Sequence, residues 1–574
     1  MPKASDVVAQ VLKEQGVTCV FELVGGMITH LLDSIHRAGQ IKIVSMHHEQ
    51  GAAFAADGHA RLTGLPGVAM ATSGPGATNL LTGIASCYFD STPAVFITGQ
   101  VNRNELKGAR AVRQLGFQEA DIVSIASPIT KAAYRAHSPE QLPQLLEQSF
   151  QVARSGRPGP VLIDIPMDVQ GADIPNFDYQ LPRDPSKMTT IEDEVAGDLI
   201  GALRTAKRPL LLLGGGIRSS AAVSAVRELV EVLGIPAVHS LMAVDALPYS
   251  NEMRVGMIGS YGNRWANLAI GEADLLLVLG SRLDIRQTGS ETASFKGHRT
   301  IFHVDCEAGE INNRITGCHA IVSDLKAFVE ALLPVARDSA LPERSTWREE
   351  ISALRHRWPD IDELTGTPGI NPNVFMHELS ASSAEAATYV ADVGQHQMWA
   401  AQSLELGPDQ RFITSGGLGS MGFGLPAAIG ASFASPGRPV ILVAGDGGFQ
   451  TNIQELQTVA RNSLPIKMVV LNNQSHGMVR QFQQTYFDSR YQSTVWGYSA
   501  PDFTSVASAY GIPSTSVSSP DEVKRAVDWS VEERGPALLQ VMISPDANTY
   551  PKIAFGRPMT EMEPFATPVG MEGT

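Results

Sequence analysis

Two short apolar runs toward the end of the chain constrain its fold more than any other feature. They are Pro439-Val-Ile-Leu-Val-Ala-Gly-Asp-Gly-Gly-Phe449 and Lys467-Met-Val-Val-Leu-Asn-Asn473. Each run is rich in β-branched residues and ends in side chains that carry oxygen, and residues 452–460 between them have the apolar spacing of a helix. A strand, a helix and a strand in this order predict a right-handed βαβ unit, whose two strands are parallel and are neighbours or nearly so.

The ends of these two strands predict a metal site. If the strands are neighbours, Asp446 and Asn473 lie at one edge of the sheet, about 4.8 Å apart. A carboxylate and an amide oxygen, beside glycines that let the backbone come close, suit a hard divalent cation that takes its other ligands from phosphate and water. Asp-Gly and Asn-Asn are also ordinary turn sequences after strands, so the spacing alone leaves a simple turn open.

The size and charge of the chain exclude several classes of protein. Its 574 residues allow three or four domains of ordinary size. A net charge of −15 without a basic block argues against a nucleic acid or an anionic membrane as partner. No stretch approaches about 18 uninterrupted apolar residues, and the chain begins with an amphipathic helix pattern rather than a signal sequence, so we expect a cytoplasmic protein. The cysteines have neither CxxC spacing nor clustering, which predicts reduced, mostly buried thiols at Cys19, Cys87, Cys306 and Cys318.

Strand and helix patterns alternate along the whole chain, which predicts layered α/β domains. At the start, Ser5 is expected to cap a helix that ends near Gly16, and residues 50–60 have the small side chains of a helix built for close packing. Residues 170–188 are rich in Pro and Asp, which predicts a linker. We therefore expect an N-terminal domain over 1–170, a central domain over 189–335, a third domain over 370–550 and a C-terminal tail over 551–574.

Three further features allow both a structural and a functional interpretation. Glu49 comes at the start of a helix pattern, where the helix dipole favours a carboxylate for structural reasons alone. The Gly-Pro-Gly sequence at 74–76 precedes a helix and can bind an anion, but a tight turn explains it equally well. Three glycines at 214–216 follow a strand pattern, yet they lack the GxGxxG spacing of a dinucleotide site.

The strand-end motifs resemble those of a known enzyme superfamily. Gly445-Asp-Gly447, with Asn473 placed 27 residues after its Asp, resembles the magnesium-diphosphate motif of thiamine diphosphate enzymes. Within that superfamily, Gln450-Thr-Asn-Ile-Gln-Glu-Leu456 and Gly477-Met-Val-Arg-Gln481 resemble the acetohydroxyacid (acetolactate) synthase large subunit. The similarity extends over about residues 4–551 and implies three doubly wound α/β domains with mainly parallel sheets. It also implies a cofactor between two subunits, with Glu49 from one subunit and the Asp446/Asn473 ion site from the other, and hence a homodimer or a homotetramer.

The resemblance implies thiamine diphosphate, Mg²⁺ and FAD as cofactors. Glu49 would be the catalytic acid at the cofactor's aminopyrimidine ring, and Gln118 and Lys131 would be catalytic residues in the channel to the reacting carbon. The implied magnesium ligands are Asp446, Asn473 and Ser475. The implied contacts to thiamine diphosphate come from Gly25, Gly26, Glu49, Pro75, Asn79, Gly394, Gln395, His396, Gly419, Met421, Gly445, Asp446, Gly447, Gly448, Asn473, Ser475, Gly477 and Met478.

In the central part of the chain, Gly256-Met-Ile-Gly-Ser-Tyr-Gly262 with Asn267, and Gly280-Ser-Arg-Leu-Asp284, resemble the flavin-binding segments of the synthase. In that family the flavin is retained although the reaction needs no net redox change. The implied contacts to FAD come from Gly214, Gly215, Gly216, Gly259, Ser260, Tyr261, Gly280, Arg282, Arg286 and Asp305. The residues implied to contact the substrates are Phe117, Arg286 and Phe482.

The implied activity is the decarboxylation of pyruvate and the transfer of its acetyl (hydroxyethyl) unit to a 2-ketoacid or another ketone, with thiamine diphosphate as the electron sink. Four places depart from the biosynthetic synthase: residues 23–27, Tyr261, residues 284–286, and Phe482 in place of the family's specificity Trp. These departures leave open a flavin-containing acetyl-transferring lyase that acts on a larger ketone or a keto-sugar. A pyruvate oxidase-like oxidative decarboxylase and a non-enzymatic, regulatory homologue are left open as well.

Overall fold

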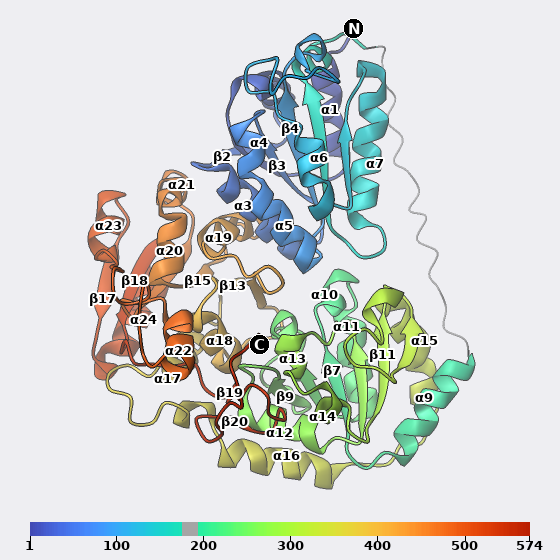
Figure 1. Ribbon diagram of the computed structural model, residues 1–574, viewed down its shortest axis with the longest axis vertical. Helices are drawn as coiled ribbons and strands as arrows, with labels where there is room; N and C mark the ends of the chain where they lie inside the picture. The colour runs from blue at the N-terminus through green and yellow to red at the C-terminus, as the bar shows by residue number, and fades with distance from the viewer. Residues whose placement is uncertain (175–192, 574) are drawn as a thin grey trace.

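The computed structural model describes residues 1–174 and 193–573. These residues form three six-stranded sheets with only parallel strand pairs, and helices flank each sheet (Figure 1). Strands of such sheets are buried on both faces, which is why they read in the sequence as continuous apolar runs. The prediction of three doubly wound α/β domains is confirmed. Most of the predicted linker over 170–188 lies outside the described residues.

The first sheet, blue in Figure 1, has the strand order β2-β1-β3-β4-β6-β5. The order reverses between β1 and β3, and ligands of such sheets bind at the carboxyl ends of the strands near this point. The strands are β1 (Cys19–Leu23), β2 (Lys42–Ser45), β3 (Gly67–Ala71), β4 (Ala94–Gln100), β5 (Ala132–Arg135) and β6 (Pro160–Pro166). The helices are α1 (Ala4–Glu14), α2 (Thr29–Ala38), α3 (Glu49–Thr63), α4 (Pro75–Asn79), α5 (Leu81–Asp90), α6 (Ile122–Ala126), α7 (Leu142–Arg154) and α8 (Met167–Gln170).

The third sheet repeats this order as β14-β13-β15-β16-β18-β17, so the first and third domains share one topology. The strands are β13 (Thr388–Ala391), β14 (Arg411–Thr414), β15 (Val440–Gly445), β16 (Ile466–Asn472), β17 (Ser514–Val517) and β18 (Ala537–Met542). The helices are α17 (Pro372–Ser382), α18 (Gln395–Ser403), α19 (Gly424–Ala434), α20 (Asp446–Thr451), α21 (Leu456–Arg461), α22 (Gly477–Tyr486), α23 (Phe503–Ala509) and α24 (Val523–Glu532).

The central sheet, green in Figure 1, has a different order, β12-β11-β10-β7-β8-β9. Its order reverses between β7 and β10, with three strands on each side, as in the dinucleotide-binding fold. The strands are β7 (Pro209–Leu213), β8 (Ala237–His239), β9 (Arg254–Met257), β10 (Leu275–Leu279), β11 (Thr300–Asp305) and β12 (His319–Val322). The helices are α9 (Asp193–Thr205), α10 (Gly216–Ser219), α11 (Val223–Leu233), α12 (Arg264–Glu272), α13 (Ile285–Thr288), α14 (Thr292–Lys296), α15 (Leu325–Arg337) and α16 (Ser345–Arg357).

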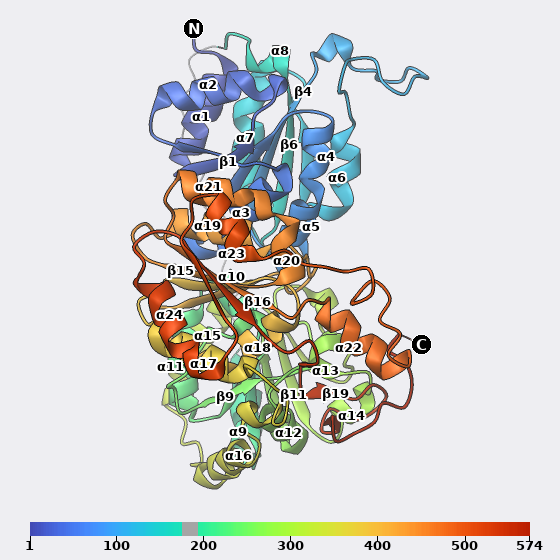
Figure 2. The ribbon, with the colours of Figure 1, turned by 90° about the vertical axis from the view of Figure 1, so that its left-hand side faces the viewer.

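Helices α3 and α19 lie between the first and third sheets and join them into one hydrophobic core (Figure 2). Their backbones come close because both helices carry small residues. A Cβ on Gly58 would lie 2.2 Å from the Ala427 carbonyl oxygen, and a Cβ on Gly430 would lie 1.9 Å from that of Ala55. Larger side chains at either glycine would push the helices apart, since protein interiors leave no spare volume. The prediction of a close-packed helix over 50–60 is confirmed.

The final residues complete the central domain instead of forming a free tail. They contain a short antiparallel pair, β19 (Lys552–Ile553) and β20 (Met562–Glu563). Ile553, Met559 and Met562 belong to a buried cluster with central strand residues such as Leu276. The Ile553 N–H also donates a hydrogen bond of 2.9 Å to the Ser260 carbonyl. The C-terminal segment therefore stabilises a domain that is distant from it in sequence.

The start of the first helix differs from the prediction. Helix α1 begins at Ala4, and Lys3 is its N-cap. The Lys3 N–H donates a hydrogen bond of 2.9 Å to the Asp6 carboxylate. The prediction that Ser5 caps this helix is wrong, because Ser5 lies inside the first turn and accepts a hydrogen bond of 2.9 Å from the Ser34 hydroxyl.

Two other predictions concern the cysteines and membrane-spanning helices. All four cysteines are free thiols; three are buried and Cys306 is exposed, which confirms the prediction of reduced, mostly buried cysteines. Among the residues that the structure describes, no helix combines the length and the apolar character needed to cross a membrane.

Candidate active site

The predicted metal residues follow two neighbouring strands. Strands β15 and β16 pair in parallel, with Gly445 opposite Leu471. Asp446 comes directly after β15 and Asn473 directly after β16, so the prediction that both lie at the carboxyl edge of the sheet is confirmed. The Gly-Asp-Gly segment differs from a simple turn, because Asp446 is the first residue of helix α20. The helix dipole favours a carboxylate at this position.

Three buried polar atoms at this edge have no hydrogen-bond partner among the described residues. They are Asp446 Oδ2, Ser475 Oγ and His396 Nε2. A buried polar atom without a partner costs about 1–3 kcal/mol. A divalent cation would satisfy the carboxylate and hydroxyl oxygens, and a phosphate oxygen would satisfy the imidazole nitrogen. The donor set therefore fits a metal ion with a diphosphate.

Burial disfavours the charged form of the Asp446 carboxyl. Burial raises the pKa of Asp446 to about 6, although the Gly447 N–H, the Tyr498 hydroxyl and the Ser475 N–H favour the charged form. The Gly447 N–H donates to Asp446 Oδ1 at 3.0 Å. A divalent cation beside the carboxylate would lower this pKa and hold the group in its charged form at neutral pH.

Asn473 is oriented by its neighbours so that its amide oxygen can also serve as a ligand. Its Nδ2 donates a hydrogen bond of 3.2 Å to Gln395 Oε1. Its Oδ1 accepts one hydrogen bond of 3.1 Å, from the Ser475 N–H. An amide oxygen has two lone pairs, so one remains for a cation. No group of three or more His, Cys, Asp or Glu side chains within the described ranges could hold a metal ion. A site built from one carboxylate and one amide suits a cation that completes its shell with phosphate and water.

The glycines predicted around the diphosphate make room for side chains of the site. A Cβ on Gly394 or Gly445 would lie within 3 Å of the His396 ring. A Cβ on Gly477 would lie 1.9 Å from Gln395 Oε1. These three positions must therefore be glycine so that His396 and Gln395 can reach the sheet edge.

The loop that carries Gly419 and Met421 is fixed by hydrogen bonds to the carboxylate of Asp392, a residue that was not predicted from the sequence. Asp392 follows β13 and accepts hydrogen bonds from the N–H groups of Gly422, at 3.0 Å, and Gly424, at 2.8 Å. Burial raises the pKa of Asp392 to about 6 against these hydrogen bonds. The signal was available, because Asp392 directly follows a buried strand, as Asp446 does. A Cβ on Gly448 would lie 2.7 Å from Asp392 Oδ1, which explains that glycine.

Glu49 is the first residue of helix α3, so the prediction of its place in the first turn is confirmed. The residue is only 6% exposed. Asn79, at the end of α4, donates a hydrogen bond of 2.9 Å to Glu49 Oε2. The other oxygen, Oε1, lies 3.1 Å from the point where a Cβ on Gly76 would stand. The carboxylate is thus held between α4 and the Gly-Pro-Gly loop.

Gln118 packs against the same Gly-Pro-Gly loop. Its backbone has φ +63°, a left-handed conformation that residues with a Cβ rarely adopt and that often marks a functional site. A Cβ on Gly74 would lie 2.8 Å from the Gln118 carbonyl oxygen. The loop after β1 approaches the same region, because a Cβ on Gly25 would lie 2.5 Å from Thr72. Phe117, beside Gln118, is 79% exposed.

Lys131 lies at the opposite end of the sheet. Its N–H donates to the Pro160 carbonyl at the amino ends of β5 and β6. Its Nζ donates to the carbonyl oxygens of Val152, at 2.6 Å, and Ser155, at 2.5 Å. Glu49 and Asn79 belong to elements that follow the carboxyl ends of the strands. The structure therefore does not bring Lys131 together with the other predicted catalytic residues.

Contacts within the chain connect the start of α3 to the βαβ unit of the third domain. The His47 N–H donates a hydrogen bond of 2.9 Å to Glu455 Oε1. The Asn452 amide donates one of 3.2 Å to Gln50 Oε1. The sequence analysis missed Glu455, whose fully buried carboxylate sits between two domains that are about 400 residues apart in sequence.

The predicted flavin segments gather at the carboxyl edge of the central sheet. Gly214 follows β7 and Gly280 follows β10, which are the two strands where the order reverses. The Gly216 N–H donates a hydrogen bond of 2.9 Å to the Gly280 carbonyl. A Cβ on Gly214 would lie 2.1 Å from the same carbonyl oxygen. Close backbone packing is therefore enough to explain these glycines. They also lie at the point of the sheet where dinucleotides bind in such folds.

The other flavin segments meet at the same edge. The Ser260 N–H donates a hydrogen bond of 2.6 Å to the Arg286 carbonyl, and a Cβ on Gly259 would lie 2.3 Å from that oxygen. Burial raises the pKa of Tyr261 to about 12, so its phenol stays protonated. Burial also raises the pKa of Asp305. The side chain of Arg286 is exposed.

The predicted specificity residue lies on helix α22. The ring of Phe482 is 4.7 Å from that of Tyr486 and 5.8 Å from that of Phe487. Met478 lies one turn earlier on the same helix, and its sulfur is 3.9 Å from the Thr549 hydroxyl. The helix follows Asn473 after only three residues, so its first turn lies near the carboxyl edge of β16.

Comparisons with known proteins agree with this architecture. The N-terminal TPP binding domain of the thiamine pyrophosphate enzymes matches residues 2–125, the central domain matches 197–332, and the C-terminal TPP binding domain matches 392–541. Each matched range covers much of one of the three sheets.

Individual relatives cover nearly the whole chain. The acetolactate synthase isozyme 2 large subunit of Escherichia coli is 39% identical over 565 residues, which are 97% of this chain and 98% of that protein. Acetolactate synthase 2, chloroplastic, of Nicotiana tabacum is 37% identical over 96% of this chain and 84% of its own. The acetolactate synthase large subunit of Lactococcus lactis is 37% identical over 97% of this chain and 95% of that protein. The chain therefore belongs to the acetolactate synthase large-subunit family of thiamine pyrophosphate enzymes.

Proposed function

We propose that this chain decarboxylates pyruvate and transfers the two-carbon unit to a 2-ketoacid or another ketone. The observation that carries the proposal is the set of unpartnered buried atoms at the edge of the third sheet, Asp446 Oδ2, Ser475 Oγ and His396 Nε2. Their charges and lone pairs match a magnesium ion and a diphosphate, which are the parts of thiamine diphosphate that a protein must hold.

Bound thiamine diphosphate supplies an electron sink for the carbon that loses carbon dioxide. The residues of the chain would bind the cofactor, orient it and move protons beside it. Asp446 and Asn473 would hold the metal ion through one oxygen each. Glu49 would hold and move a proton at Oε1, while Asn79 fixes Oε2. Gln118 and the Gly-Pro-Gly loop would shape the channel. Lys131 would take no part, because its Nζ donates to two carbonyl oxygens at the far end of the sheet.

We infer that the central domain holds FAD. The support is topological, since the glycines at 214–216 and Gly280 lie where the strand order reverses, and Asp305 lies at the end of the next strand, where an acidic residue can bind a ribose. Arg282 lies directly after this edge and is 3.6 Å from Asp284. Such an arginine can pair with the pyrophosphate of the flavin.

We infer that a second copy of this chain covers the proposed site. Several large apolar side chains on the site segments of the first and third domains are exposed in the single chain, as they would be on the surface of a subunit that pairs with another. They are Val24 at 61%, Phe117 at 79%, Met421 at 39%, Val479 at 52% and Trp496 at 52%. A homodimer is the smallest assembly that would bury them, and a homotetramer would contain two such interfaces. The cytoplasmic location stays a prediction.

The acceptor is the part of the function that the family does not decide. Phe482 stands where the biosynthetic synthases have a Trp, so a larger ketone or a keto-sugar fits as acceptor as well as a 2-ketoacid. An oxidative decarboxylase would instead use the flavin as electron acceptor. Analysis of products by mass spectrometry, with pyruvate alone and then with added ketones, tests the proposal. We expect 2-acetolactate from pyruvate alone; acetate with consumption of oxygen or quinone would support the oxidase, and no product would contradict the proposal.

A further inference from the structure

Helix α18 connects the two cofactor sites proposed above. It packs against β13 and β15 of the third sheet and against β9 of the central sheet (Figure 1). All nine of its residues, Gln395–Ser403, are buried. At its start, Gln395 Oε1 accepts the Asn473 amide at 3.2 Å, and His396 Nε2 has no partner among the described residues. Its other end, at Gln402, meets the central domain.

The side-chain amide of Gln402 holds the turn that carries three of the proposed flavin residues. Its Nε2 donates hydrogen bonds to the Tyr261 carbonyl, at 2.9 Å, and to the Tyr550 carbonyl, at 3.1 Å. The backbone carbonyl of Gln402 accepts the Asn263 side-chain amide at 3.2 Å. One residue of the third domain therefore binds this turn at two points and ties it to the C-terminal segment.

The beginning of the same turn is held from within the central domain. Asn267 Oδ1 accepts the Gly259 N–H at 2.9 Å, and Asn267 Nδ2 donates to the Gly259 carbonyl at 3.0 Å. The Tyr261 carbonyl accepts its hydrogen bond from Gln402 instead. The turn is thus fixed between two domains, and its geometry depends on where α18 lies.

Gln402 is itself held in one orientation. Its Oε1 accepts the Asn373 side-chain amide at 3.0 Å, and the same amide donates to Ser403 Oγ at 2.8 Å. Gln402 is 3% exposed, and Asn373 and Ser403 are fully buried. A rotated amide would place its oxygen against two carbonyl oxygens and leave buried groups unpaired, which is costly. The Asn373 contact therefore keeps Nε2 directed at the flavin turn.

The two ends of α18 are about 13 Å apart, as expected for nine residues of helix. His396 would be fixed at one end by a bound diphosphate, and the Tyr261 turn at the other by a bound flavin. The second ligand then meets a helix that is already ordered, so its binding costs less conformational entropy. We propose that Gln402 positions the flavin-binding turn and, through α18, links FAD binding to diphosphate binding. The inference rests on the cofactors proposed above and adds the residue that connects their sites.

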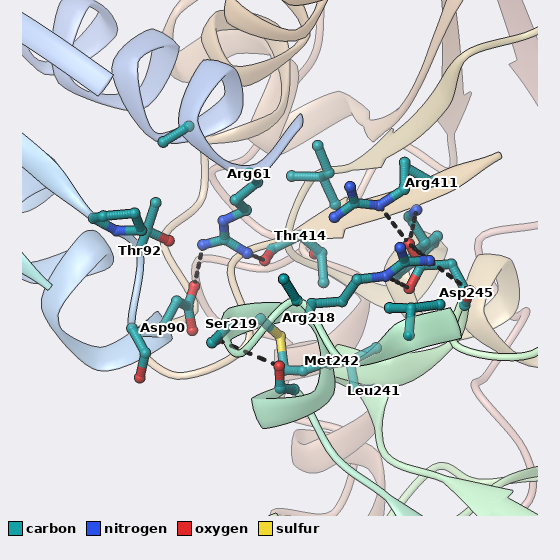
Figure 3. Close-up of a pocket in the computed structure, with 18 of the residues that line it drawn as sticks. Arg61, Asp90, Thr92, Arg218, Ser219, Leu241, Met242, Asp245, Arg411 and Thr414 are labelled. Atoms are coloured by element: carbon teal, nitrogen blue, oxygen red, sulfur yellow. Dashed lines mark hydrogen bonds and ion pairs between the residues drawn. The ribbon is translucent and has the colours of Figure 1, made fainter. Parts of the chain in front are cut away.

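Other contacts keep the central and third domains together without Gln402. Asp245 of the central domain accepts Arg411 Nε at 3.0 Å and the Phe412 N–H at 3.1 Å, both from the third domain. Figure 3 shows Arg411 and Arg218 converging on this aspartate. Met257 belongs to a buried cluster formed mostly by residues of the third domain. A substitution at Gln402 should therefore change the turn without separating the domains.

Titration of FAD into the full-length protein freed of cofactors, with and without thiamine diphosphate and magnesium, tests the proposal. Flavin fluorescence follows the binding. We expect the wild type to bind FAD at least about 5-fold more tightly when thiamine diphosphate and magnesium are present, a typical size for coupling between two sites. FAD should raise the affinity for thiamine diphosphate by the same factor, because such coupling is reciprocal. In Gln402→Met, which keeps the length of the side chain but cannot donate, both factors should fall to near one.

Gln410→Met is the matched control. Gln410 is also buried in the third domain, and its Nε2 also donates to backbone carbonyls, those of Ser383, at 3.0 Å, and Ala384, at 3.2 Å. It precedes β14 at the amino end of that strand, whereas both proposed cofactor sites lie at carboxyl ends. Gln410→Met should therefore keep the wild-type coupling even if it lowers the melting temperature.

A second variant acts on Gln402 only through its orientation. Asn373→Ala removes the hydrogen bond to Gln402 Oε1, so it should also lower the coupling, and it carries the test if Gln402→Met does not fold. Unchanged coupling in the Gln402 variant, an equal loss in Gln410→Met, or FAD affinity in the wild type that does not respond to thiamine diphosphate would each overturn the inference alone. A wild type that binds no FAD or no thiamine diphosphate would overturn the proposed cofactors, and the inference with them.

Discussion

The Asn79 side chain, which ends α4, donates a hydrogen bond of 2.9 Å to the Glu49 carboxylate, which begins α3. This bond holds Oε2 in place and leaves Oε1 beside the Gly-Pro-Gly loop. Glu49 therefore supplies the acid and Asn79 orients it, so a substitution at each residue tests proton transfer and positioning separately.

We expect Glu49→Gln to lower pyruvate turnover and exchange of the C2 proton of bound thiamine diphosphate by roughly 10²-fold or more, since the amide keeps the shape but cannot hold and release the proton. Asn79→Ala keeps the acid and loses only its hydrogen bond, so its loss should be smaller. Glu14→Gln, at the exposed end of α1, is the control for effects of expression and purification. Proton exchange by NMR measures the effect, and near-normal exchange in Glu49→Gln would remove Glu49 from the catalytic set.

We expect Asp446→Ala to fold but to lose retention of thiamine diphosphate in magnesium, because the diphosphate then lacks its counter-ion. Burial raises the pKa of Asp446 to about 6, which means that the charged group is costly without a cation, so the cofactor-free variant should be at least as stable as wild type. Calorimetry measures cofactor affinity, and Asp521→Ala, in an exposed 3-10 helix, is the matched control. Unchanged affinity in Asp446→Ala would mean that the first turn of α20 is only structural.

We expect the purified protein to be yellow from bound FAD and to stay oxidised during turnover with pyruvate, since carboligation transfers no electrons to the flavin. Arg282→Gln should weaken retention of the flavin on dialysis, because the arginine is placed to pair with its pyrophosphate. Absorbance spectra before and after dialysis measure both effects. Rapid bleaching by pyruvate would favour the oxidase, and a colourless, fully active protein would exclude FAD.

We expect little preference for 2-ketobutyrate over pyruvate as acceptor, and Phe482→Trp should restore that preference and narrow the range of ketones accepted. Discrimination by one methylene in an apolar pocket is worth only about 1–3 kcal/mol, so loss of the indole can remove most of it. Competition between the two ketoacids, followed by the product ratio, measures the preference. A strong preference for 2-ketobutyrate in the wild type would assign the role to another side chain, such as Met478.

We expect the protein to lose stability as the pH rises through the pKa of His377. Its two ring nitrogens lie 2.8 Å from Glu405 and 3.0 Å from Asp360. Burial lowers the pKa of His377, but the hydrogen bonds and charges of the two carboxylates outweigh it and raise the pKa overall. The stabilisation is therefore complete below the unfolded pKa of about 6.5 and is lost above the folded pKa.

Denaturant unfolding at about pH 6 and about pH 9 measures this difference. The wild type should lose on the order of 1 kcal/mol more than His377→Gln, which cannot carry the charge. The same slope in both proteins would show that His377 does not contribute to the pH dependence.

The sequence by itself determined the sheet edge on which the proposed function depends. Runs of β-branched residues that end in Asp446 and Asn473, with one helical segment between them, can form only parallel strands whose carboxyl ends meet at one edge. The same local reasoning placed Glu49 at a helix start. Asp392 carries the same signal and could have been found in the same way.

Tertiary structure decided which of the other residues belong to the site. Lys131 matches the family pattern in sequence, but the strand after it begins at Ala132, so its side chain emerges at the amino end of the sheet. The sequence predicts a tail over 551–574, and only contact with the central sheet shows that Ile553 and Met562 belong to its core. Local patterns report one chain segment at a time, whereas these features come from contacts between segments hundreds of residues apart, which are settled by packing.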